Sequence, residues 1–302
     1  MKVSVIVCTH NRAYAIGPCL DSIAQALANA APVAAEIVVV DNASTDDTSA
    51  VVREWAKTSA FPVNIQFESR KGLANARNCG IRAARGDLLV WTDDDCRLDK
   101  DHISDALRHD AADIEPVLRG GRVELGDPTD LPMSIKTDLT PARWSRQMGS
   151  AKRVSLGYCI AGCNMIMRRT LVERLGPFDW RFSTKAIPAA EDTDYIFRAY
   201  LAGLTIEYVP DAVVFHFHGR KTISDKNKLM RNYMIGKGAV YAKHFFRDPN
   251  LCRPAFFHFW LALKEIIFGR NNYKPDVEFR KFAAYYIMGA MRYCATFLKR
   301  PQ

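Results

Sequence analysis

The sequence lacks the two glycine-rich motifs that most often hold phosphate groups. No GxGxxG follows the first apolar run, which argues against a dinucleotide site of the Rossmann type, and no GxxxxGK[ST] loop is present. The 8 cysteines form no CxxC pair and no Cys/His zinc spacing. No charged n-region with an apolar stretch and a cleavage site is found, so we expect no secretory signal. Dispersed cysteines in such a chain indicate reduced, buried thiols.

The sequence also lacks a clean stretch of about twenty apolar residues, so it predicts no transmembrane span. Its charge is uneven: residues 219–302 hold 17 Lys or Arg against 5 Asp or Glu, whereas residues 1–218 hold 25 against 28. Within the basic part, Phe256–Phe268 and Phe282–Leu298 are aromatic helix candidates. Such helices suit the surface of an anionic membrane. Packing on the main domain and a dimer contact are the alternatives.

The first hundred residues alternate strand and helix patterns. Apolar runs typical of buried strands are separated by apolar residues at helical spacing. This alternation predicts an α/β fold with a parallel sheet and right-handed crossovers. Because ligands bind beyond the carboxyl ends of such strands, we expect Cys8–Arg12, Asp41–Asp46 and Asp93–Asp95 to converge on one site. The predicted strands are Val3–Val7, Ile37–Val40, Val63–Phe67 and Leu88–Thr92, and Leu73–Ala84 is a predicted helix.

The alternation ends at about residue 110. The segment 126–155 contains prolines that break any long helix, and we expect it to be irregular. Tyr158–Arg168 is a predicted strand that Gly162 interrupts. The other predicted elements are strands at Gly120–Leu125, Thr205–Val209 and Ala212–Phe217 and a helix at Glu191–Ala202.

Three consecutive aspartates, Asp93, Asp94 and Asp95, directly follow the predicted strand Leu88–Thr92. Like charges side by side repel each other and are costly to desolvate, so packing alone rarely explains them. At the end of a buried strand they can hold a hard divalent cation against a phosphate group. A turn or a helix cap is the alternative for the triplet taken alone. Cys96, the next residue, offers a sulfur to a soft metal, although packing is the favoured role.

Several motifs occur in a fixed order: Val3–Arg12, Val38–Thr48, Lys71–Asn78, Gly86–Asp95, Gly162–Asn164, Gly176–Asp179 and Glu191–Asp192. In this order they resemble the motifs of family-2 glycosyltransferases. The resemblance covers residues 1–218 and implies the GT-A fold, a Rossmann-like, mostly parallel sheet flanked by helices. It implies a nucleotide-binding half of about 1–110 and an acceptor half of about 111–218. Residues 219–302 are then a C-terminal helical, basic and aromatic extension.

The resemblance implies a nucleotide-sugar donor that is bound largely by the first half. Asp41 is expected to accept a hydrogen bond from a ring N–H such as that of uracil, with a turn cap as the alternative. Arg77 offers its fork of donors to the diphosphate, or else it is a solvated charge on a helix face. Relatives place the first aspartate of their DxD pattern near the ribose, which directs Asp93 and Asp94 toward the sugar or ribose. The remaining donor-binding candidates are Thr9, Asn11 and Arg12.

The same resemblance assigns Mg2+ or Mn2+ to Asp95, with His216 as a further contact. Glycosyl transfer needs a base for the acceptor hydroxyl, and Asp192 matches the catalytic position of the family. Its place at the start of a helix helps to keep it ionised. Glu191 and Asp194 are the alternative bases, and simple first-turn helix charge is the structural alternative. The candidates near the acceptor or the transferred sugar are Gly162, Asn164 and Glu191.

These expectations describe a metal-dependent, inverting hexosyl-type glycosyltransferase, peripheral on the inner, cytoplasmic face of the cytoplasmic membrane. It would move a sugar, UDP-linked by preference, to a glycan or lipid-linked acceptor in polysaccharide or cell-surface glycan synthesis. No nucleic-acid partner is expected. A sugar nucleotidyltransferase is disfavoured because no glycine-rich phosphate loop follows the first strand. An inactive protein of the same fold, whose basic tail binds membrane or polyanions, is the other alternative, and the intact acidic motifs argue against it.

Overall fold

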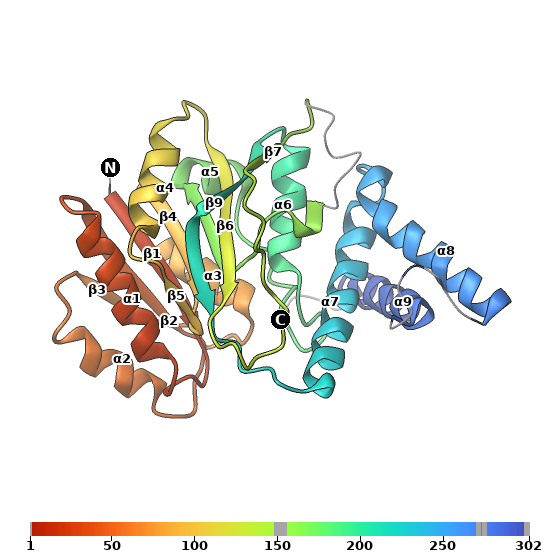
Figure 1. Ribbon diagram of the computed structural model, residues 1–302, viewed down its shortest axis with the longest axis horizontal. Coiled ribbons are helices and arrows are strands. Elements are labelled where there is room, and N and C mark those ends of the chain that lie inside the picture. Colours follow the sequence, from red (N-terminus) through yellow and green to blue (C-terminus); the bar gives the residue numbers. More distant parts are fainter. Residues whose placement is uncertain (1, 148–155, 270–272, 274–276, 299–302) are drawn as a thin grey trace.

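A computed structural model describes residues 2–147, 156–269, 273 and 277–298 of the chain. Within these residues, nine strands form one sheet that has helices on both faces (Figure 1). Helices α1 (Ile16–Asn29) and α4 (His102–Ala111) cover one face with a continuous apolar core. Helices α3 (Leu73–Ala83) and α6 (Glu191–Leu201) cover the other face. This layering is the α/β architecture expected from the sequence.

The first four strands are parallel and lie in the order β3-β2-β1-β4. Side chains of β1 alternate between the faces, so that Val5 belongs to the core under α1 and Ile6 to the core under α3. Helix α3 approaches the sheet closely at Gly80, where a Cβ would lie 2.5 Å from Cγ2 of Ile6. The bounds are β1 Lys2–Thr9, β2 Ala34–Asp41, β3 Val63–Phe67, β4 Leu88–Asp93 and, for helix α2, Thr48–Ala56.

The second half of the sheet is mixed. Strand β8 (Asn164–Arg168) is antiparallel to both β4 and β6 (Val117–Leu125). Strand β9 (Thr205–His216) runs parallel to β6 and shifts its register between Gly121 and Arg122. The prediction of a parallel sheet is therefore confirmed for the first four strands, while the acceptor half follows a different topology.

Two strand predictions were wrong in detail. The predicted strand Tyr158–Arg168 forms only in its second half, because Leu156–Tyr158 is a 3-10 turn. The predicted strands Thr205–Val209 and Ala212–Phe217 are one strand, because the register shift against β6 absorbs the bend between them. Residues 148–155 of the segment expected to be irregular lie outside the described residues. Short elements that the sequence did not predict are β5 Cys96–Leu98, β7 Ala142–Trp144 and α5 Arg169–Leu175.

The C-terminal helices pack against the α6 side of the sheet (Figure 1). Helices α7 (Ile223–His244) and α9 (Phe279–Thr296) cross closely, and a Cβ at Gly238 would lie 2.2 Å from the carbonyl oxygen of Tyr286. Buried side chains of both helices belong to the same apolar core as those of α3 and α6. The basic extension therefore shares its core with the sheet.

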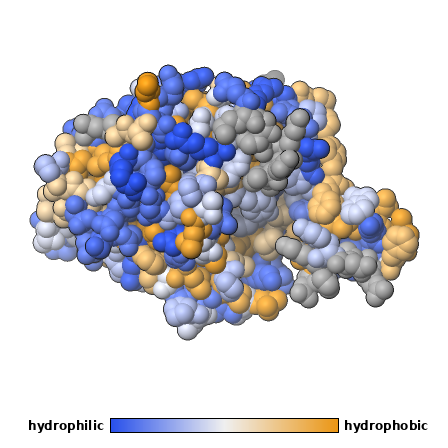
Figure 2. Space-filling model, turned by 45° about the horizontal axis from the view of Figure 1, so that its top comes forward, coloured by the Kyte–Doolittle hydropathy of each residue, from blue (hydrophilic) through white to orange (hydrophobic). Residues whose placement is uncertain are grey.

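Helix α8 (Arg253–Phe268) lies at one end of the molecule and leaves large apolar side chains exposed. In Figure 2, apolar atoms gather on the lobe at the right of the view, at the end that α8 forms. Among the described residues, no helix combines the length and apolar character needed to cross a membrane. The exposed apolar residues of α8 are Phe256, Phe257, Trp260, Leu263, Ile266, Ile267 and Phe268.

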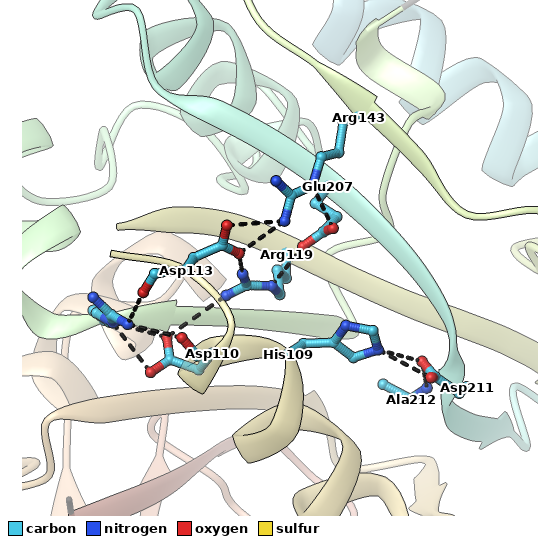
Figure 3. Close-up of polar contacts among 9 residues, drawn as sticks. His109, Asp110, Asp113, Arg119, Arg143, Glu207, Asp211 and Ala212 are labelled. Atoms are coloured by element: carbon cyan, nitrogen blue, oxygen red, sulfur yellow. Dashed lines mark hydrogen bonds and ion pairs between the residues drawn. The ribbon is translucent and has the colours of Figure 1, made fainter. Parts of the chain in front are cut away.

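A closed ion cluster joins α4, β6, β7, β8 and β9 (Figure 3). The side chain of Arg119 is 0% exposed, and its Nε donates to Glu207 at 2.6 Å, while Nε of Arg143 donates to the other oxygen of Glu207 at 2.6 Å. Arg168, a further member, is the register partner of Leu88 at the start of β4. The cluster therefore lies at the opposite end of β4 from the aspartate triplet. Its members are Arg119, Arg143, Arg168, Asp110, Asp113 and Glu207.

Candidate active site

The carboxyl ends of β1, β2 and β4 bring the predicted polar segments together. Asp41 is the register partner of Thr9, and Asp93 is that of Cys8. The two aspartates therefore flank the end of β1, which confirms the predicted convergence. Thr9 is 2% exposed, and its carbonyl accepts a hydrogen bond from the backbone N–H of Asn42 at 2.8 Å.

Asp41 and Asn11 organise the loops at the outer side of this site. The Asp41 carboxylate accepts hydrogen bonds from the backbone N–H of Ser44 at 2.9 Å and from the hydroxyl of Ser49. Asn11 has a φ of 54°, and its Oδ1 accepts from the backbone N–H of Thr45 at 2.7 Å. These bonds tie the loop after β1 to the loop after β2. Base recognition by Asp41 stays a prediction, because both carboxylate oxygens already accept hydrogen bonds from residues that follow in the chain.

Arg12 and His216 hold two members of the aspartate triplet. Nε of Arg12 lies 3.4 Å from Asp94 Oδ1, and its Nη2 lies 3.2 Å from Asp95 Oδ2. Nε2 of His216 lies 3.3 Å from Asp95 Oδ1. Burial acts to raise the pKa of Asp95, but His216 and Arg12 outweigh it and hold that pKa below the usual range. In contrast, burial and the neighbouring carboxylates raise the pKa of Asp94 to about 7.

Arg77 lies next to Asp93, the first aspartate of the triplet, and its side chain is 3% exposed. Its Nη1 lies 3.3 Å from Oε1 of Glu191, and its Nη2 lies 3.6 Å from Oδ1 of Asp93. The same Nη2 donates to the carbonyl of Gly162 at 2.9 Å, and the guanidinium lies 5.4 Å from the ring centroid of Phe178. The alternative of a solvated helix charge was therefore wrong. Contact with the diphosphate stays a prediction, since protein acceptors surround the guanidinium.

The three acidic residues in the first turn of α6 have different surroundings. Asp194 is 0% exposed and is held by Lys243 at 2.8 Å and by Nε2 of His244 at 2.7 Å, which argues against its being the alternative base. Glu191 is 5% exposed and pairs with the buried guanidinium described above. Asp192 alone of the three is partly exposed, and its Oδ1 accepts from the next backbone N–H at 2.6 Å.

Gly162 allows the chain to pass close to Asp192, because a Cβ there would lie 2.7 Å from Asp192 Oδ2. Asn164, expected near the sugar, requires a correction. It is 0% exposed, and its Nδ2 donates to the carbonyls of Arg122 at 3.0 Å and Ala212 at 2.9 Å. Its Oδ1 bonds to a histidine ring of α4 at 2.9 Å. All its polar atoms thus satisfy buried groups next to the register shift of β9, and none faces the site.

Helix α7 contributes a lysine that the sequence analysis missed. Nζ of Lys237 lies 3.0 Å from the ring centroid of Tyr158, and it has no hydrogen-bond partner among the described residues. Burial lowers the pKa of Lys237 to about 7, and the charge of Asp192 opposes this shift. A Cβ at Gly236 would lie 2.6 Å from the carbonyl oxygen of Ala189, so the glycine lets α7 approach the start of α6. The only signal in the sequence is a lysine between two glycines.

Carboxylates outnumber the positive groups that form ion pairs with them in this site. Burial of unmatched carboxylates is costly, and a divalent cation relieves that cost. Carboxylate oxygens are ligands that Mg2+ and Mn2+ prefer, so the donor set fits such an ion. The carboxylates are those of Asp93, Asp94, Asp95, Glu191 and Asp192. Arg12, Arg77 and His216 form the ion pairs with them, and Arg220 and Lys237 act at longer range.

Comparison with known proteins places this geometry in a family. The sequence model described as Glycosyl transferase family 2 matches residues 4–176. The chain belongs to this family. It is 28% identical over 220 residues to the probable glycosyltransferase YdaM of Bacillus subtilis, covering 71% of this chain and 50% of that protein. It is 25% identical over 239 residues to glycosyltransferase AglE of Haloferax volcanii, covering 79% of this chain and 73% of that protein. The chain thus spans about half the length of the first of these two relatives.

Solved structures of similar fold cover nearly the whole chain. The mannosyltransferase PcManGT of Pyrobaculum calidifontis, in complex with GDP-Man and Mn2+, has a TM-score of 0.63 at 24% identity and covers 97% of this chain and 86% of its own. TarS 1–349 of S. aureus, in complex with UDP, has a TM-score of 0.55 at 18% identity and covers 99% of this chain and 92% of its own. This likeness confirms the predicted GT-A fold.

Proposed function

We propose that this family-2 glycosyltransferase is a metal-dependent, inverting enzyme that moves a sugar from a nucleoside-diphosphate donor to a hydroxyl of a glycan or lipid-linked acceptor. The observation that carries the proposal is the cluster of carboxylates at the end of β4, beside the partly exposed Asp192 at the start of α6. A relative named poly(ribitol-phosphate) beta-N-acetylglucosaminyltransferase TarS supports a role in cell-surface glycan synthesis.

The loops after β1 and β2 are proposed to bind the donor. Asp41 is the group for a ring N–H of the base, and UDP is the nucleotide that we favour. Thr9 and Asn11 are proposed to contribute to the same donor site, because Oδ1 of Asn11 and the carbonyl of Thr9 both accept hydrogen bonds from the loop after β2. Asp93 and Asp94 are directed toward the ribose or sugar.

Asp95 and His216 are the residues proposed to hold Mg2+ or Mn2+. Nε2 of His216 lies 3.3 Å from Oδ1 of Asp95, and Nη2 of Arg12 lies 3.2 Å from Oδ2 of Asp95. Arg12 thereby keeps Asp95 ionised and oriented before any cation is present. When bound, the cation supplies Lewis-acid stabilisation of the charge on the departing diphosphate.

Asp192 is the proposed base. It takes the proton of the acceptor hydroxyl while that oxygen attacks the anomeric carbon on the face opposite the diphosphate, which inverts the configuration. Arg77 positions Asp192 relative to the donor, because it joins the neighbouring Glu191 to Asp93. Lys237 adds a positive group within electrostatic range of Asp192.

Helix α8 is proposed to contact an anionic membrane surface on the cytoplasmic side, as part of a 219–302 extension of the 1–218 catalytic domain. Its exposed apolar side chains and the basic charge of this region support that proposal. Nζ of Lys264 lies 3.8 Å from the ring centroid of Trp260, which places a cation beside an aromatic anchor.

Co-sedimentation with phosphatidylglycerol vesicles tests this surface, with phosphatidylcholine vesicles as the charge control. The double variant Trp260→Ser/Ile266→Ser should lose most binding. Equal binding of variant and wild type would show that α8 is not the contact.

Hydrolysis of UDP-, GDP- and dTDP-sugars with Mn2+ or Mg2+ tests the catalytic proposal. We expect turnover of one donor by the wild type and loss of that turnover in Asp95→Asn and Asp192→Asn. Absence of both turnover and metal-dependent nucleotide binding would contradict the proposal. Nucleotide binding that depends on salt but not on metal would instead favour a protein whose basic surface binds polyanions.

A further inference from the structure

We propose that Cys96, Cys163 and His216 form a site for the thiophilic cation Zn2+, adjoining the proposed donor-cation site and sharing His216 with it. Cys96 opens β5 directly after the aspartate triplet, Cys163 precedes β8, and His216 ends β9. His216 is also the register partner of Cys96. The sheet itself therefore fixes the relative position of two of the three ligands.

The three side chains have the separation that a small metal site needs. One ligand atom of each lies within 4.8 Å of the others, and the residues are only 0%, 6% and 6% exposed. Tetrahedral zinc, with Zn–S of about 2.3 Å and Zn–N of about 2.0 Å, needs ligand atoms about 3.5–3.8 Å apart. Small rotations of the side chains bring ligand atoms that lie within 4.8 Å of one another to this spacing. Within the described part of the chain, no other group of three such ligands comes this close.

His216 is already oriented for a metal. Its Nδ1 lies 3.2 Å from the carbonyl oxygen of Ser134, and a proton donated there directs Nε2 toward the site. Metal-binding histidines are commonly fixed by such a bond to a carbonyl. Nε2 lies 3.3 Å from Oδ1 of Asp95, so that carboxylate offers the fourth ligand.

Binding of Zn2+ replaces protons and changes no oxidation state. Each thiol releases its proton as its S–Zn bond forms, and Nε2 of His216 releases its own when the N–Zn bond forms. Two thiolates and the Asp95 carboxylate then carry three negative charges against the two positive charges of the ion. Arg12, at 3.2 Å from Asp95, offsets the remainder.

The site has a consequence for the proposed catalysis. Sulfur ligands select Zn2+ over Mg2+ and Mn2+. Asp95 and His216 are also the proposed ligands of the donor cation. When Zn2+ is bound by these two residues, they are no longer available to Mg2+ or Mn2+. Zn2+ therefore inhibits Mn2+-dependent donor binding, and the two cysteines set the zinc sensitivity.

Co2+ is the spectroscopic probe for the site, because thiolate-to-cobalt charge transfer absorbs in the near ultraviolet. We expect the wild type to bind one Co2+ with two thiolate ligands, to release protons, and to lose the band when Zn2+ is added. Cys96→Ser and Cys163→Ser should each weaken the band and lower zinc affinity at least tenfold. Cys159→Ser, which changes another buried thiol, is the matched control and should behave as the wild type does.

The wild-type spectrum decides the matter even where a serine variant fails to fold. A wild type without a thiolate–cobalt band, or variants that keep the full band, would overturn the proposal. The Co2+ readout does not depend on turnover, so a failure of the proposed transferase function leaves it intact. Where donor turnover is found, half-inhibition of Cys163→Ser should need a Zn2+ concentration at least tenfold higher than that of the wild type.

Discussion

Two polar clusters of the same sheet differ in how their charges are matched. At the start of β6, three guanidiniums meet three carboxylates, and the fully buried Arg119 has acidic partners for its charge. At the carboxyl end of β4 and the start of α6, two guanidiniums and one histidine form ion pairs with four of five carboxylates, and Arg220 and Lys237 act at longer range. Nearby, Lys237 has no hydrogen-bond partner among the described residues.

The difference separates structural from functional electrostatics. A matched cluster needs no ligand, and removal of one member leaves an uncompensated buried charge. An unmatched cluster keeps a free-energy cost that a cation and a phosphate relieve, and such clusters are typical of functional sites. Substitutions in the first cluster should therefore lower stability, whereas removal from the second cluster of a carboxylate with a raised pKa, such as Asp94, should lower activity and leave stability equal or higher.

Removal of the proposed base gives the largest expected effect. In Asp192→Asn, donor turnover should fall about 10²- to 10⁴-fold, because the acceptor or water loses its base. The unfolding midpoint in urea should not fall. The matched control is Asp194→Asn, which breaks buried contacts to Lys243 and His244 and should lose stability instead. A stable Asp194→Asn without turnover, beside an active Asp192→Asn, would reverse the assignment.

Arg119→Met tests the matched cluster. The substitution leaves buried carboxylates without their guanidinium, so the free energy of unfolding should fall by about 3–5 kcal/mol. Turnover per folded molecule should remain, since the cluster lies at the far end of β4. Arg108→Met is the surface control: its side chain is 58% exposed and pairs with Asp105 and Asp211. It should cost less than about 1 kcal/mol in the same urea titration.

Lys237→Met should stabilise the fold while it lowers turnover. The pKa of Lys237 in the folded chain, about 7, lies below that of a lysine in an unfolded chain, about 10.4. The unfolded state therefore binds more protons between these values, and wild-type stability should rise as pH increases from 7 toward 10. The variant should lack this rise and be more stable than the wild type at pH 7, by up to about 4 kcal/mol from these two pKa values. If the wild type and Lys237→Met have the same free energy of unfolding across this pH range, the ammonium of Lys237 is compensated by neighbouring groups and the prediction is wrong.

Asp94→Asn tests the sign of the triplet's contribution. The raised pKa of Asp94, about 7, means that the folded chain holds a proton that the unfolded chain releases near pH 4. Wild-type stability without metal should therefore fall as pH rises from 4 to 7. In Asp94→Asn this fall should shrink, giving a gain of about 1 kcal/mol at pH 8 without metal. Saturating Mn2+ should reduce the difference, and an equal pH dependence in both proteins would contradict the account.

The sequence predicted those parts of the site that local pattern determines. Strands and their ends follow from apolar runs, so the convergence of Asp41 and Asp93 at the end of β1 could be predicted. Partners from distant segments could not be. Arg77 has the sequence context of an ordinary helix residue, and its burial depends on Glu191, more than a hundred residues away.

Asn164 and Lys237 both show that a sequence motif does not determine which side chains face the site. Asn164 belongs to a motif, yet its Nδ2 donates to two carbonyls beside the register shift and its Oδ1 bonds to a histidine ring of α4, which no local pattern reveals. Lys237 belongs to no motif, and only the close packing of α7 at Gly236 brings it to the start of α6. Motif position thus predicted where the site lies, while packing decides which side chains remain available to a ligand.

The unmatched carboxylates are proposed to hold a divalent cation against a nucleoside diphosphate. Calorimetric titration of UDP and GDP into the wild type and Asp95→Asn, with Mn2+ and with EDTA, tests it most directly. The account predicts that one nucleotide binds the wild type with Mn2+, and that EDTA or the substitution abolishes the binding. Nucleotide binding that is unchanged by both EDTA and Asp95→Asn would contradict it.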